Sequence, residues 1–272
     1  MVVTGTIENR SGDHAKDIRL AVSFYNEDGE LLDVWQGTPV FTTIKDGQQV
    51  AFQAQTSLGS PRDVESHAVY VVGFRGLPSP EPEDDVAELR SSRIEVDEVG
   101  TLRVLGEVRA TTDEVAVDVT IAAVFYDNED KIVGAGSAKP IPVRVPPESS
   151  APFEMALHAP PNGYDRVEYT VLGQRYEDRG TWPQPLEVVD EDFTLSAGRA
   201  TVRGNVRNDT DDDMHDVFVV VTYYNSTDKV VDVASLNLDD PDLGEGDAEA
   251  FELSSRVSGV DSAKVRAYGY RE

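Results

Sequence analysis

The segment Val3-Thr4-Gly5-Thr6-Ile7 decides the fold of this chain, because two later segments repeat it in the same register. They are Val104-Leu105-Gly106-Glu107-Val108 and Val202-Arg203-Gly204-Asn205-Val206. An aromatic pair follows each glycine at one constant distance, and a phenylalanine follows at a longer one: Phe24-Tyr25 and Phe52, Phe125-Tyr126 and Phe153, Tyr223-Tyr224 and Phe251. Self-similarity at a fixed period is the signature of a repeated structural unit.

Apolar residues alternate with polar or small ones in the run that leads into each aromatic pair. In the first copy Ile18, Leu20, Val22 and Phe24 hold every second position. A period of two indicates strands with one buried and one wet face, as in an antiparallel sandwich. Turn-forming Asn, Asp and Gly then follow, as at residues 26–29. The sequence therefore predicts an all-β chain of three tandem immunoglobulin-like antiparallel β-sandwich domains.

The repeats also predict the domain boundaries. We expect domains at residues 1–76, 91–176 and 186–272, joined by linkers at 77–90 and 177–185. Both linkers are rich in proline and charge, and proline would interrupt a central strand. They are therefore expected to be short and fairly stiff connections.

The first domain differs from the others at its start. Residues around 94–96 and 186–188 are expected to form a first strand in the second and third domains, whereas only Met1–Thr4 precede the glycine of the first, so its first strand is apparently missing. We expect simple truncation, with a signal peptide or lipid anchor removed upstream of Met1, and a monomer in solution. The alternative is strand-mediated assembly, in which a neighbouring molecule pairs with the exposed sheet edge.

The charge balance is strongly acidic. The chain has 51 Asp and Glu against 24 Lys and Arg, for a net charge of −27, and its basic residues are mostly Arg. Such a charge opposes the compact state in dilute buffer and is screened in molar salt. The composition favours a protein of a halophile, and the alternative is an ordinary acidic secreted protein. Nucleic acid is disfavoured as a partner, because phosphate binding requires clustered Lys and Arg.

Composition excludes several further classes. There is no cysteine, so disulfides, zinc–thiolate sites and thiol nucleophiles cannot form. No apolar run is long enough for a transmembrane segment in this chain.

A family resemblance rests on Gly5-Thr-Ile-Glu-Asn9 with Phe24-Tyr-Asn26, and on Gly204-Asn-Val-Arg-Asn208 with Tyr223-Tyr-Asn225. This order resembles the FxLYD family of immunoglobulin-like domains. The second copy departs from it, with Ala110 at the Asn position and a proline pair in place of the glycine turn. The resemblance implies a secreted or lipid-anchored protein of the cell envelope, generally without a known activity.

Candidate chemistry is sparse. The four histidines His14, His67, His158 and His215 stand at non-equivalent positions, and no pair has a metal-ligand or triad spacing. The acidic runs at 211–213 and 239–242 are interpreted as solvated surface, because neither follows a calcium-loop pattern. We therefore predict no catalytic, cofactor-binding or metal-binding residues, and no enzyme activity.

Three N-x-[ST] triplets and two tryptophans remain. Asn9, Asn208 and Asn225 are candidate glycosylation acceptors, with polar turn residues as the alternative. Trp35 is expected in the core, and Trp182, in the second linker, is expected to pack two domains together.

The predicted function is a non-enzymatic interaction or spacer module, extracellular or in the cell envelope, that meets a protein or polysaccharide partner. The alternative is a secreted carbohydrate-binding or accessory module of an enzyme system, which would need an exposed aromatic platform or a cleft. A hydrolase would need a concave site with paired carboxylates of perturbed pKa.

Overall fold

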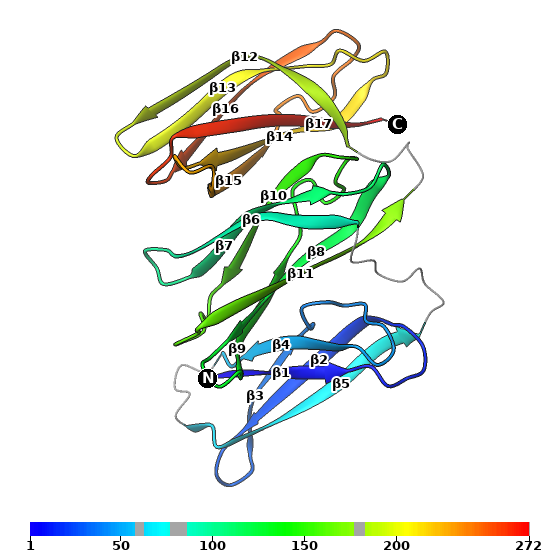
Figure 1. Cartoon of the computed structure of the whole chain (residues 1–272), viewed down its shortest axis with the longest axis vertical. Helices are drawn as coiled ribbons and strands as arrows, with labels where there is room; N and C mark the ends of the chain where they lie inside the picture. Colours follow the sequence, from blue (N-terminus) through cyan, green and yellow to red (C-terminus); the bar gives the residue numbers. More distant parts are fainter. Residues whose placement is uncertain (58–62, 77–85, 177–182, 272) are drawn as a thin grey trace.

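A computed structural model describes residues 1–57, 63–76, 86–176 and 183–271, and within them the chain is all β with no α-helix (Figure 1). The strands form three successive sets, which we call the first, second and third repeats. The first contains β1 (Val2–Glu8), β2 (Ala15–Tyr25), β3 (Leu31–Gly37), β4 (Gln49–Gln55) and β5 (Ser66–Gly76). The second contains β6 (Ala87–Val96), β7 (Leu102–Ala110), β8 (Val115–Tyr126), β9 (Ile132–Ala138), β10 (Ser150–Leu157) and β11 (Arg166–Tyr176). The third contains β12 (Gln184–Ser196), β13 (Arg199–Arg207), β14 (Met214–Tyr224), β15 (Val230–Asn237), β16 (Ala248–Arg256) and β17 (Ser262–Arg271).

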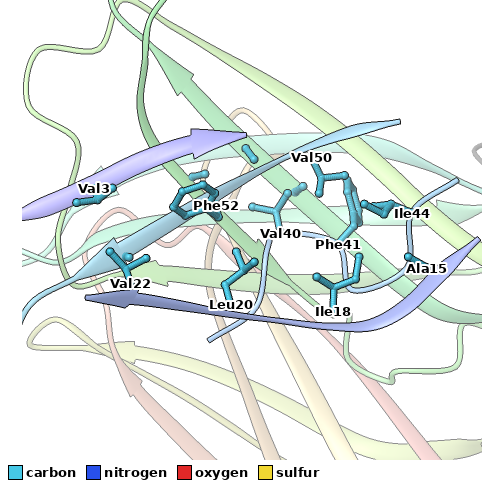
Figure 2. Close-up of a cluster of buried hydrophobic side chains, with 14 of the residues drawn as sticks. Val3, Ala15, Ile18, Leu20, Val22, Val40, Phe41, Ile44, Val50 and Phe52 are labelled. Carbon is cyan, nitrogen blue, oxygen red and sulfur yellow. The ribbon is translucent and has the colours of Figure 1, made fainter. Parts of the chain in front are cut away.

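Each repeat has two antiparallel layers with a buried apolar cluster between them, as the periodicity predicted. In the first repeat the sheet β3-β2-β5 faces β1-β4, and in the second β11-β8-β9 faces β10-β7-β6. In the third repeat β12 pairs first with β17 and then with β13, so all six strands join in the order β15-β14-β17-β12-β13-β16. Figure 2 shows the cluster of the first repeat, in which Val22 and Phe52 approach from opposite layers.

The equivalence of the repeated aromatic residues is confirmed. Phe24, Phe125 and Tyr223 have no exposed surface, and Phe52, Phe153 and Phe251 are buried in the three clusters. The constant distance from glycine to phenylalanine has a direct cause. Gly5, Gly106 and Gly204 each pair across the sheet with the phenylalanine of their own repeat. The aromatic ring lies over the glycine, where a Cβ atom would stand within about 3 Å of it.

The first strands of the second and third repeats begin earlier than the predicted boundaries. β6 begins at Ala87 and β12 at Gln184, inside the segments predicted as linkers 77–90 and 177–185. β6 then pairs with β7, so that Ile94 lies opposite Val104 as expected of a first strand. In the first repeat, β1 pairs with β4 and has no second partner among the described residues.

The two tryptophans have different outcomes. Trp35 in β3 is half-buried and packs on the edge of the first cluster, with its ring over Gly37. Trp182 lies outside the described residues. No helix in the described part of the chain is long and apolar enough to cross a membrane.

Candidate functional site

Two of the three candidate glycosylation residues are structural. Asn208 is fully buried at the end of β13, and its Nδ2 donates to the carbonyls of Asp212 at 2.8 Å and Leu243 at 2.9 Å. Its Oδ1 accepts from the backbone N of Thr210 at 3.1 Å and from its hydroxyl at 2.7 Å. Both amide hydrogens are therefore used inside the fold, and a glycan on Nδ2 would displace one of them.

Asn9 makes the same contacts in the first repeat. It is buried, donates to the carbonyls of Asp13 at 2.7 Å and Ile44 at 3.1 Å, and accepts from Ser11. Asn225 differs, because it is only half-buried in the turn before β15 and its Oδ1 accepts from Thr227 and Lys229. The N-x-[ST] pattern at Asn9 and Asn208 is thus the signature of a loop in which the amide and the hydroxyl replace backbone partners.

The substitution Asn208→Ala is expected to lower the free energy of unfolding by about 2–3 kcal/mol, because it removes two hydrogen bonds to backbone carbonyls, one of them buried, and the acceptor of the Thr210 N–H. Chemical denaturation of the full chain measures this effect. Asn225→Ala is the matched control, and removing its exposed turn contacts is expected to cost about 1 kcal/mol or less. Equal losses in the two variants would contradict the structural role of Asn208.

The remaining polar candidates do not assemble into a site. Within the described ranges, no group of three or more His, Asp or Glu side chains is placed to hold a metal ion. His215 contacts Asp242, with 3.1 Å between Nδ1 and Oδ1, at the surface of the third repeat.

The contacts between repeats form the most distinctive arrangement in the molecule. At the first junction, the outer face of the sheet β1-β4 meets the sheet β11-β8-β9 of the second repeat (Figure 1). The Thr4 hydroxyl donates to the carbonyl of Ile132 at 2.6 Å, and Gln53 both accepts from the N of Ala135 and donates to the carbonyl of Ala159, each at 3.0 Å. Ala122, Ala135 and Leu172 of the second repeat are buried in the apolar cluster of the first.

The second junction joins the equivalent surfaces with charged groups. Arg103 on β7 lies between carboxylates of its own repeat, Glu95 and Glu154, and reaches Asp232 on β15 at 2.7 Å. The hydrogen bonds and charges of Glu154 and Asp232 raise the pKa of the Arg103 guanidinium and keep it charged. Nearby, the Tyr224 hydroxyl donates to the buried Glu107 carboxylate at 2.9 Å. Burial and the Glu107 charge raise the pKa of Tyr224, so it is a neutral donor at ordinary pH.

A cleft of about 560 Å³ opens beside this junction and is lined by basic side chains of both repeats. Arg266 approaches Glu107 at 3.5 Å, and its Nη1 is buried without a hydrogen-bond partner among the described residues. The positive charge of Arg266, together with partial burial, lowers the pKa of the neighbouring Lys264. Positive charge is thus concentrated at a contact between repeats in a chain that is otherwise strongly acidic.

Both junctions use the same pair of surfaces. The docking face of a repeat is the outer face of the sheet β5-β2-β3, β11-β8-β9 or β17-β14-β15. The receiving face of a repeat is the outer face of the strands β1-β4, β10-β7-β6 or β16-β13-β12. Each of the two junctions places the docking face of one repeat on the receiving face of the repeat before it (Figure 1).

The two ends of the array present opposite chemistry. Among the described residues no other repeat covers the docking face of the first repeat, and its Leu31, Val34 and Val72 are 57%, 41% and 58% exposed. The receiving face of the third repeat is polar, with an exposed ion pair between Arg203 and Glu252 and a hydrogen bond between Thr201 and Ser254. Sequence reasoning missed these faces, although the run Tyr70-Val71-Val72 breaks the alternation of β5 and could have marked one of them.

Comparisons with known proteins add little to this description. No family model matches the chain, and no curated protein matches it. A solved structure of a calcium-binding mutant of Bacteroides uniformis β-glucuronidase 2 aligns over 94% of this chain with 13% identity and a TM-score of 0.19. The chain spans 28% of the length of that protein.

Proposed function

We propose that the chain is a non-enzymatic interaction and spacer module of three immunoglobulin-like domains, adapted to high salt and placed outside the cell or in the cell envelope. The observation that carries this proposal is the repetition of one junction: the same two surfaces join the first repeat to the second and the second to the third. Repeats that contact their neighbours in this way form a directional array. The resemblance to FxLYD domains and the acidic composition support the location and the salt adaptation.

The array is expected to be rigid, and spin labels can test this because the chain has no cysteine. Cysteines introduced at Asp28 and Ser226, in exposed turns of the first and third repeats, report the distance across both junctions by electron–electron double resonance. We expect one narrow distance distribution for the parent chain. The double variant Arg103→Ala with Glu107→Ala removes the polar contacts of the second junction and is expected to broaden it.

The matched control is Arg203→Ala with Glu252→Ala, which removes the same two residue types from an exposed pair that lies outside both junctions. It is expected to leave the distribution unchanged. A broad distribution in the parent chain would contradict the spacer proposal.

The alternative, a carbohydrate-binding or accessory module, has one observation in its favour. Tyr70 and Phe74 on β5 are both about half exposed, as an aromatic platform requires. Tyr70, however, belongs to the docking face, and its equivalent Arg266 contacts Glu107 at the second junction. Retarded migration in polysaccharide gels that Tyr70→Ala and Phe74→Ala abolish would favour the alternative.

A further inference from the structure

The docking face of the first repeat matches, position by position, the faces that are buried at the two junctions. Strand pairing makes Val72 equivalent to Leu172 and Tyr268. Each of the three directly follows a residue that pairs with the same position of the central strand in its own repeat. Leu172 is 8% exposed and Tyr268 is 3% exposed, whereas Val72 is 58% exposed. Leu31 corresponds to Ile132 and Val230, and Val34 corresponds to Ala135 and Val233. Val230 and Ala135 are buried, and Ile132 and Val233 are half-buried.

The carboxylate that meets Arg103 at the second junction also has a counterpart on the edge strand β3 of the first repeat, beside the docking face. Asp33 lies opposite Phe24 as Asp232 lies opposite Tyr223, so the two carboxylates are equivalent. Oδ2 of Asp33 accepts from Thr56, in the same way that Asp232 accepts from the equivalent Ser255. Oδ1 of Asp232 accepts from Arg103 of the preceding repeat, whereas Oδ1 of Asp33 accepts only from the neighbouring Val34 backbone among the described residues. These hydrogen bonds lower the pKa of Asp33 and keep it anionic.

We propose that the docking face of the first repeat binds the receiving face of a further β-sandwich domain, outside these 272 residues, in the geometry of the two junctions within this chain. The proposal rests on the proposed interaction function and names the partner class. The partner's sheet carries an aliphatic side chain at the place of Leu105, which is fully buried at the second junction, and an arginine at the place of Arg103. The arginine would pair with Asp33 and the aliphatic side chain would cover the exposed apolar residues.

A second copy of this chain does not fit as the occupant. The receiving faces of its first and second repeats are covered by the repeats that follow them. The receiving face of its third repeat has Arg203 at the Leu105 position and Thr201 at the Arg103 position. A charged side chain at the Leu105 position would face the exposed apolar residues of the docking face without a partner.

The chain itself supplies a probe for the missing partner. The triple variant Thr201→Arg, Arg203→Leu and Asn205→Glu copies Arg103, Leu105 and Glu107 onto the third repeat, where Glu252 already stands at the position of Glu154. This variant is expected to assemble head to tail through the docking face of a second molecule. Sedimentation of the full chain in about 2 M KCl measures the association, with long-range repulsion screened.

Adding Val72→Glu to the triple variant places an unpaired carboxylate in the contact and is expected to weaken association on the order of 100-fold. Val99→Glu is the matched control, because Val99 is 87% exposed in the turn between β6 and β7 and lies on neither end face. It is expected to leave assembly unchanged. Circular dichroism establishes that each variant is folded.

Three outcomes would overturn the proposal. The first is a folded triple variant that stays monomeric. The second is assembly that Val72→Glu does not weaken. The third is self-association of the parent chain that Val72→Glu disperses, which would make the occupant a second copy. A narrow spin-label distance in the parent chain would still support the spacer function, so failure of the two proposals can be told apart.

Discussion

The substitution Gly106→Ala is expected to destabilise the second repeat by about 3 kcal/mol, although it adds a single methyl group. A Cβ atom on Gly106 would stand 2.2 Å from the carbonyl oxygen of Ser91 and 2.8 Å from the Phe153 ring. The carbonyl belongs to the neighbouring strand β6, so the clash can be relieved only by moving backbone. Denaturant unfolding of the full chain, followed in the near ultraviolet, measures the loss.

Gly5→Ala is the matched control, because Gly5 holds the equivalent position next to the unpaired side of β1. Its Cβ would meet only the edge of the Phe52 ring, at 3.1 Å, and no backbone atom of another strand. Alanine also restricts the unfolded chain, which stabilises by about 0.4–1 kcal/mol, so the net change at Gly5 is expected to be small. If Gly5→Ala is as damaging as Gly106→Ala, the backbone clash does not explain the glycine.

The melting temperature is expected to rise by roughly 10 °C or more between 0.1 and 2 M KCl. The chain has a net charge of −27, so its negative charges repel one another. This repulsion is strongest in the folded state, which holds the charges close together. The Debye length falls from about 10 Å at 0.1 M to about 3 Å at 1 M, so salt removes most of the repulsion. Scanning calorimetry over a series of KCl concentrations measures the rise.

A charge-reduced variant separates screening from other effects of salt. Glu27→Gln, Glu98→Gln and Glu245→Gln remove three exposed carboxylates that make no ion pair with the described residues. The variant is expected to melt higher than the parent at 0.1 M and to depend less on KCl, because less repulsion remains to be screened. A melting temperature that is flat from 0.1 to 2 M in the parent chain would refute the salt adaptation.

Pattern in the sequence was sufficient for the architecture within each repeat. The period of two along β2 placed Leu20, Val22 and Phe24 in the core, and all three have no exposed surface. Glycine and phenylalanine at constant spacing marked a cross-strand pair, although the pairing itself became visible only in the sheet register. Alternation carries this information because each strand buries one face against its own partner sheet.

The N-x-[ST] motif marked Asn9 and Asn208 as candidate glycosylation acceptors, with polar turn residues as the alternative. Their burial depends on the carbonyls of Ile44 and Leu243, which come from a loop 35 residues away along the chain. A three-residue motif reports the local partners, Ser11 and Thr210, and contains nothing about the distant ones. Only the folded loop shows that the amides are internal.

By itself, the sequence determined the repeat, the antiparallel sandwich, the core aromatics and the acidic surface, because each follows from composition or from spacing within one repeat. Tertiary structure alone decided which outward-facing residues are covered. Val220 and Leu105 point away from their own cores and are fully buried, while Val72 points outward and is exposed. A strand's periodicity records burial inside its own sandwich, whereas the contact between sandwiches depends on how whole faces meet in space.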